Sequence, residues 1–171
     1  KPLTLRNALI IELLLSTGLR VSELSNIKID DMDLKNNEIR VMGKGSKERV
    51  VYYRESTKNK LYYYFKDGRS SLLNGKYSPY LFVNNNGGKL TDRGVRYIIE
   101  GIIKKCSINV RVTPHTFRHT FATMLLNVGC DIRSVQELLG HANLNTTSIY
   151  THLTNETIRK TYLNAHPHGK Y

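Results

Sequence analysis

Apolar residues recur every three to four positions in the first part of the chain, which is the spacing of one buried helix face. This pattern predicts a helix over 4–16 that ends at Gly18, because glycine readily takes the left-handed conformation of a C-cap. A second short helix is predicted over 21–25. Residues 27–33 mix polar and apolar side chains, so we expect a connecting strand or loop there.

Two short segments with strand-like composition then predict a β-hairpin over 38–42 and 49–53. Between them, the sequence Gly-Lys-Gly-Ser-Lys over 43–47 is rich in turn-forming residues. A helix is predicted over 57–66 and a loop over 67–78.

A short strand over 80–83 and an Asn/Gly turn over 84–89 lead into a helical second half. Three helices are predicted there. Their expected N-terminal caps are Thr91, Thr113 (followed by Pro114) and Asp131. The second should stop at Gly129 and the third at Gly140.

Phe117, Phe121 and Leu125 share one face of the second of these helices and are expected in the core. Two more helices are expected over 146–151 and 155–165, with Pro167 as a breaker. Together these elements predict a mainly α domain with a small antiparallel β-sheet (α+β).

The chain has 171 residues, of which 40% are hydrophobic, enough for a packed core, and we expect 1–171 to form a single domain. Its 26 Lys and Arg against 14 Asp and Glu give a net charge of +12. Such a surplus favours a polyanionic partner, either nucleic acid or an anionic membrane surface, over an inert basic surface.

There is no run of about 18 apolar residues that would span a membrane, and no signal peptide is visible. Cys106 and Cys130 form no disulfide framework and no metal-ligand spacing. We therefore expect a cytoplasmic protein.

His115 and Arg118 lie three residues apart in the first turn of a predicted helix, where backbone N–H groups and the helix dipole favour an anion. Arg20 directly follows a predicted helix end, and Glu23 is placed to hold its guanidinium group. The alternative for this second pair is a surface ion pair worth less than about 1 kcal/mol.

Four segments together resemble the catalytic signature of the tyrosine recombinase, or phage integrase, family. They are Thr-Gly-Leu-Arg-Val-Ser-Glu-Leu over 17–24, His-Thr-Phe-Arg-His-Thr-Phe-Ala-Thr over 115–123, Leu-Leu-Gly-His over 138–141, and Tyr150. Each piece is weak alone, but their order and spacing are very specific. The closing segment, with His166-Pro167, is most similar to the bacterial Xer branch. The family's helical N-terminal domain, which clamps the other face of the DNA, is expected to be absent from this chain, which also lacks a starting Met.

The resemblance implies site-specific DNA recombination by metal-independent cleavage and religation, with Tyr150 as the nucleophile of a 3′-phosphotyrosyl intermediate. Arg20 and Arg118 would bind the non-bridging phosphate oxygens, with His115 and His141 as further contacts.

Lys44, at the hairpin tip, would be the general acid for the leaving 5′-oxygen, with Lys47 as a competing candidate. Glu23 would orient the arginines, and His119 is assigned to structure. Less specific roles stay open: Lys44 as a solvated turn lysine, His141 as a helix-capping residue, and Tyr150 as a packed helix residue.

No cofactor and no metal are expected. The implied partners are a double-stranded DNA recombination site and further copies of the chain, in a tetrameric synapse where the tail helix over 155–165 packs in trans. No membrane partner is expected.

Three other functions are alternatives. A type IB topoisomerase shares the tyrosine chemistry but relaxes supercoils. A non-catalytic DNA-binding regulator would use 131–150 as a helix-turn-helix. A metal-dependent nuclease would use Asp30, Asp31 and Asp33, which lie in a polar connector without a nearby histidine.

Overall fold

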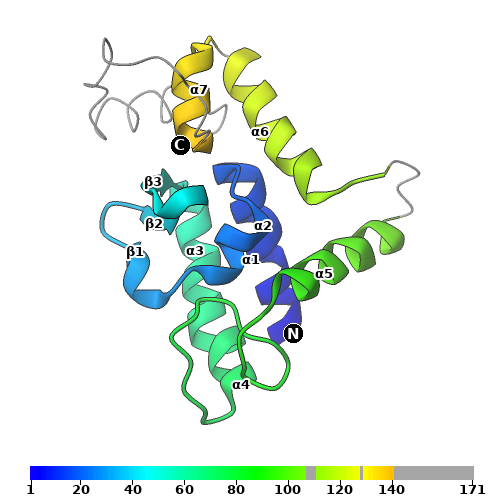
Figure 1. Ribbon diagram of the computed structural model, residues 1–171. Coiled ribbons are helices and arrows are strands. Elements are labelled where there is room, and N and C mark those ends of the chain that lie inside the picture. Colours follow the sequence, from blue (N-terminus) through cyan, green and yellow to red (C-terminus); the bar gives the residue numbers. More distant parts are fainter. Residues whose placement is uncertain (107–110, 128, 141–171) are drawn as a thin grey trace.

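The computed structural model describes residues 1–106, 111–127 and 129–140 (Figure 1). His141, Tyr150 and the helices predicted over 146–151 and 155–165 lie outside these residues. Within them, the predicted mainly helical fold with a small antiparallel sheet is confirmed.

Helix α1, Pro2–Thr17, supplies the centre of the core, and α2, Val21–Asn26, follows it after a sharp turn. Leu9, Ile10, Leu13 and Leu14 of α1 are fully buried. Burial of each such side chain stabilises the fold by about 1.5–3 kcal/mol. Both helices were predicted, and α1 is slightly longer than expected.

Gly18 ends α1 as predicted, with a left-handed backbone (φ 66°) and its amide 3.2 Å from the carbonyl of Leu14. A Cβ atom at this position would lie only 2.5 Å from Cδ1 of Phe121 in α6. Glycine is therefore needed both for the backbone conformation and for the close approach of α6.

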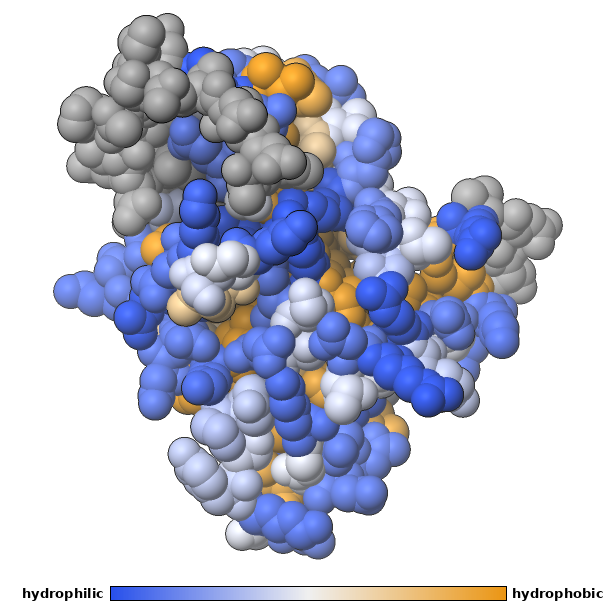
Figure 2. Space-filling view, viewed as in Figure 1, coloured by the Kyte–Doolittle hydropathy of each residue, from blue (hydrophilic) through white to orange (hydrophobic). Residues whose placement is uncertain are grey.

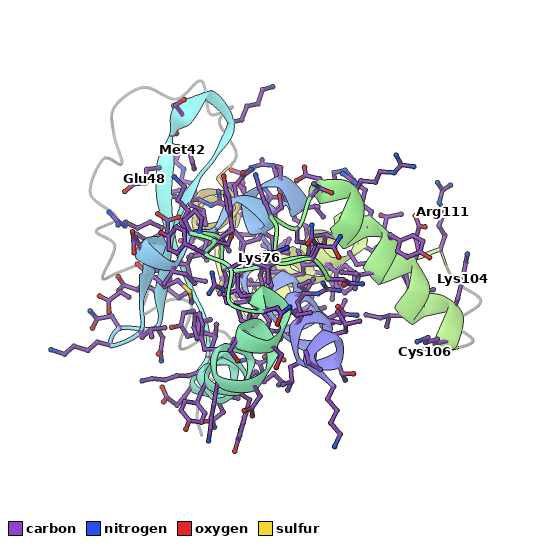
Figure 3. The ribbon with its side chains drawn as sticks, turned by 90° about the horizontal axis from the view of Figure 1, so that it is seen from below. Met42, Glu48, Lys76, Lys104, Cys106 and Arg111 are labelled. Atoms are coloured by element: carbon purple, nitrogen blue, oxygen red, sulfur yellow. The ribbon has the colours of Figure 1, made fainter. Side chains whose placement is uncertain are left out.

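The sheet has three antiparallel strands in the order β1 (Met32–Asp33), β2 (Glu38–Met42) and β3 (Glu48–Tyr52), preceded by the 3₁₀ turn η1, Ile29–Asp31. Met42 and Glu48 pair on either side of the turn, whose tip projects away from the helices (Figure 3). The predicted hairpin is thus confirmed, with a 3₁₀ turn at its tip.

The loop predicted over 67–78 is wrong in its first half. Helix α3, Glu55–Tyr63, continues through the π-helical η3, Tyr64–Arg69, into α4, Ser70–Leu73. Gly68 lies inside this helical segment. It is buried, and a Cβ there would lie 2.8 Å from Cδ2 of Tyr64 and 3.3 Å from Cβ of Leu5. Glycine at this position lets the helix approach α1 closely.

The strand predicted over 80–83 is also not formed as such. Only two isolated bridges occur there, Lys28 with Tyr80 and Val83 with Lys89. Residues 84–88 of the predicted turn lie between the members of the second bridge.

The three predicted helices of the second half are confirmed as α5 (Asp92–Lys105), α6 (Pro114–Asn127) and α7 (Ile132–Leu139). The side chains of Thr91 and Asp131 cap α5 and α7 by accepting from the amides of Gly94 and Ser134. At the start of α6, the Thr116 hydroxyl accepts from the amide of Thr113.

Helix α7 is fastened to α6 and β3 by a second apolar cluster. Its members, all buried, are Tyr52, Phe121, Leu125, Cys130, Val135, Leu138 and Leu139. Phe117, by contrast, belongs to the main core. All three α6 side chains predicted to be buried are buried. Because Phe117 packs in the main core and Phe121 and Leu125 pack in the second cluster, α6 connects α7 to the rest of the molecule.

Hydrophilic side chains dominate the face seen in Figure 2, with apolar side chains showing in smaller patches between them. Lys104, Cys106 and Arg111, at the end of α5 and beyond it, lie across the molecule from the hairpin (Figure 3). No helix in the described part of the chain is long and apolar enough to cross a lipid bilayer.

Candidate active site

Three chain segments that are distant in sequence meet near the end of α1. Arg20 is the N-cap of α2, and Glu23 lies in its first turn. Arg49 comes from β3 and Arg118 from α6. Two of these arginines, Arg20 and Arg118, and the glutamate were predicted as site residues, and the structure brings them together.

Glu23 is the centre of this group, with only 3% of its side chain exposed. Its Oε1 atom lies 2.9 Å from Nη1 of Arg20 and 2.6 Å from Nη1 of Arg49. Its Oε2 atom accepts from the Arg20 amide at 2.8 Å and from Nη2 of Arg49 at 3.0 Å. The alternative of a weak surface pair between Arg20 and Glu23 is therefore wrong, because the carboxylate is buried and shared.

Burial by itself raises the pKa of Glu23, but hydrogen bonds and the positive charges of Arg49 and Arg20 outweigh it and lower the pKa below its ordinary value. The carboxylate is therefore ionised at neutral pH despite its burial.

Arg118 is also buried, at 9% exposure. Its Nη1 atom donates to the carbonyl of Gly18 at 2.7 Å, and its Nη2 atom donates to the carbonyl of Leu139, the last residue of α7. Burial, together with the charge of Arg20 and partly offset by Glu23, lowers the pKa of Arg118 to about 10. The guanidinium is still protonated at neutral pH, and its orientation is set by two backbone carbonyls.

The remaining site residues in the described part of the chain are exposed. His115 is exposed in the first turn of α6, one turn before Arg118. Lys44 and its competitor Lys47 are both exposed in the hairpin turn. His119, which was assigned to structure, is exposed as well.

His141 and Tyr150 lie outside the described residues, so their predicted roles stay predictions. The described chain leads directly to His141, because α7 ends at Gly140 with a left-handed backbone (φ 64°). The carbonyls of Leu138 and Leu139, just before it, accept hydrogen bonds from Arg49 and Arg118.

Sequence analysis missed Arg49, although a signal for it exists. In the hairpin register, Arg49 pairs with the buried Val41, and Val51 pairs with the buried Ile39. Side chains of pairs two residues apart lie on the same face of a sheet. A charged residue on the core-facing side requires a buried partner of opposite charge, here Glu23.

Two of the three acids proposed for a nuclease serve local structure instead. Asp31 accepts from the amide of Lys28, and Asp33 accepts from the amides of Lys35 and Asn36. Among the residues described, no three histidine, cysteine or acidic side chains group as potential metal ligands.

Chemically, the described group combines three guanidinium ions with one carboxylate. Arg20 is the most accessible of the three, with 33% of its side chain exposed. Fixed, planar donors of this kind match the oxygens of a phosphate or another oxyanion.

The model of the phage integrase family matches residues 1–157. The tyrosine recombinase XerC of Bacillus pumilus is 50% identical over 169 residues, which cover 97% of this chain and 55% of the relative. The chain thus spans about half the length of the curated relatives it matches.

Two solved structures are similar throughout most of the chain. The XerA recombinase superposes with a TM-score of 0.74 at 40% identity, covering 92% of this chain and 57% of that one. The XerH site-specific recombinase, solved bound to its difH substrate in a pre-cleavage complex, gives a TM-score of 0.72 at 33% identity, covering 93% and 46%.

The shared carboxylate leads to a prediction about acid stability. Because folding lowers the pKa of Glu23, its stabilising effect is fully present above the unfolded pKa of about 4.3 and is lost as the pH falls through the folded pKa. Glu23→Gln should therefore lower the free energy of unfolding by about 3–5 kcal/mol at neutral pH. Urea unfolding at several pH values should show this difference shrinking below about pH 4.

Glu137→Gln is the matched control, because burial and the nearby Asp131 raise the pKa of Glu137. Its replacement should not destabilise the protein at neutral pH. A stability loss for Glu23→Gln that is the same at all pH values would contradict the assignment of Glu23 as an ionised, shared partner.

Proposed function

Since this chain belongs to the phage integrase family, we propose that it catalyses site-specific DNA recombination through a covalent bond between Tyr150 and a DNA phosphate. The observation that carries the proposal is the group of Arg20 and Arg118 around one buried carboxylate. These are two of the residues that the family signature assigns to phosphate binding. The relatives named above, all recombinases, add support.

In the proposed cleavage step, the Tyr150 oxygen attacks the scissile phosphorus as the phenol loses its proton. The bond from phosphorus to the 5′-oxygen breaks, leaving a 3′-phosphotyrosine and a 5′-hydroxyl. In the reverse step, a 5′-hydroxyl from a partner strand attacks and releases the tyrosine. The phosphotyrosine keeps the bond energy, so religation needs no ATP.

Negative charge grows on the non-bridging oxygens during this attack, and Arg20 and Arg118 would stabilise it. His115 would add a donor from the first turn of α6, and His141 would contact the same phosphate. Because both arginines are already oriented by protein groups, little reorganisation is needed when the phosphate binds. This scheme uses no metal ion or organic cofactor.

The leaving 5′-oxygen needs a proton, which we assign to Lys44. Its place in the hairpin turn, at the exposed tip, suits a group that reaches DNA. The net charge of +12 supports a double-stranded DNA recombination site as the partner, since neutralised phosphates release counterions.

The two alternative functions, a type IB topoisomerase and a non-catalytic DNA-binding regulator, are less well supported. The relatives are named as recombinases and not as topoisomerases. A non-catalytic regulator would leave the group of Arg20, Glu23 and Arg118 without a shared purpose.

We further propose that recombination takes place in a tetrameric synapse, with the tail helix over 155–165 packed on a neighbouring subunit. Ile158, Tyr162 and Leu163 recur at roughly helical spacing, and a short amphipathic helix needs a surface that covers its apolar side. Packing in trans would couple placement of Tyr150 to assembly.

The nucleophile is tested by covalent capture. The protein is incubated with nicked duplexes of randomised sequence, and adducts that survive SDS are sequenced and digested for mass spectrometry. The DNA-linked peptide should contain Tyr150, and Tyr150→Phe should abolish the adduct with little change in DNA affinity. Tyr162→Phe is the control and should still form the covalent adduct. Wild type should also form the adduct in the presence of EDTA. An adduct formed by Tyr150→Phe would transfer the role to another residue.

The general acid is tested with a substrate that carries sulfur in place of the bridging 5′-oxygen. Lys44→Ala should slow cleavage of ordinary DNA by a factor of about 10²–10⁴. The sulfur leaving group needs no proton, so much of the rate should return. Lys47→Ala should cleave ordinary DNA like wild type, and Arg118→Ala should not be rescued. Equal rescue of the Lys44 and Arg118 variants would refute their separate roles.

The tail is tested by truncation after Leu153. Single-site DNA binding, measured by gel shift, should change little, whereas synapsis and strand exchange should fall strongly. Ile158→Ala with Tyr162→Ala in the untruncated chain should have the same effect. Normal recombination by the truncated protein would mean that the tail makes no contact in trans.

A further inference from the structure

Arg49 joins three of the segments that carry predicted catalytic residues, namely the start of α2, the hairpin and the end of α7. It lies on β3, five residues after Lys44. Its Nη1 and Nη2 atoms hold both oxygens of Glu23, at 2.6 and 3.0 Å. Its Nε atom donates to the carbonyl of Leu138, near the end of α7, at 3.1 Å.

Two glycines pack against the Arg49 side chain. A Cβ at Gly140, the residue before His141, would lie 2.9 Å from Nη1 of Arg49, and a Cβ at Gly43, the residue before Lys44, would lie 3.6 Å from the same atom. The guanidinium thus lies close to the backbone that leads into both predicted catalytic residues.

Arg49 is poorly placed to touch a substrate itself. Only 12% of its side chain is exposed, compared with 33% for Arg20. Its bonds run inward, to a carboxylate that is 3% exposed and to a helix end. A guanidinium can make all three bonds at once because its donors are fixed in one plane, whereas the single ammonium of a lysine cannot reproduce this arrangement.

We infer that Arg49 is a positioning residue for the proposed reaction. It locks the Glu23 carboxylate that orients Arg20, and it holds the end of α7 against the hairpin that bears Lys44. The inference rests on the proposed function for its effect on cleavage, but its effect on Arg20 does not depend on DNA.

The test compares Arg49→Gln, Arg49→Lys and a matched control, Arg54→Gln. Arg54 is similarly buried at 18% exposure and pairs with Glu12 at 2.7 Å. It belongs to none of the segments around the site. Each variant is measured for urea stability, for affinity to the nicked duplex captured by wild type, and for single-turnover cleavage of the bound duplex. The NMR signals of the Arg20 and Arg118 side-chain Nε–H groups are recorded without DNA.

Arg49→Gln should bind the duplex within a few-fold of wild type but cleave it about 100-fold more slowly, the cost of a small misplacement of reacting groups. The bridging-sulfur substrate should not rescue it, since the defect is not in proton transfer. The Arg20 signal should shift or broaden. Arg49→Lys should be intermediate. Arg54→Gln should lose stability but cleave like wild type, with the Arg20 signal unchanged.

Cleavage at the wild-type rate by Arg49→Gln, or equal cleavage losses in the Arg49→Gln and Arg54→Gln variants, would overturn the inference. So would an unchanged Arg20 signal in both Arg49 variants. If Arg49→Gln fails to fold, Arg49→Lys supplies the same comparisons. If wild type forms no adduct, the proposed function fails. The NMR signal of Arg20 in the Arg49 variants still shows whether Arg49 positions the Arg20 side chain.

Discussion

The buried carboxylate of Glu23 is the constraint on which this site depends. Three guanidinium groups converge within the described region, and like charges at this distance repel in a poorly solvated interior. One carboxylate shared by Arg20 and Arg49 offsets much of that repulsion and leaves an excess of positive charge. The Glu23 carboxylate therefore allows three arginines to lie close together and still leaves a net positive charge that favours an anion.

The end of α7 is tied to this cluster through its backbone. The last carbonyls of a helix lack partners within the helix and carry partial negative charge. Arg49 and Arg118 donate to the carbonyls of Leu138 and Leu139. These guanidinium groups therefore supply both the missing hydrogen bonds and a positive charge beside the negative end of the helix. Gly140 leaves room for the approach. The segment that leads to His141 is thus attached to Arg49 and Arg118 through the backbone of α7.

Much of the fold follows from local pattern. The hairpin, the capped starts of α5 and α7 and the glycine ends of α1 and α7 were predictable, because each rests on neighbours in sequence. The helical continuation over 67–73 was not, because glycine has a low helix propensity and residues 67–78 were predicted as a loop. Only the packing of Gly68 against Leu5 of α1 explains why a helix continues there and why glycine suits it.

For the site, the sequence alone determined Arg20, Glu23, His115 and Arg118 as candidates, because their spacings are local and match a family signature. Tertiary structure decided the rest. The burial of Glu23 depends on Arg49, 26 residues away, and the orientation of Arg118 depends on a carbonyl 100 residues away. Local spacing can show that two side chains share a helix face, but the dielectric environment and the third partner of a charge are set by segments that only folding brings together.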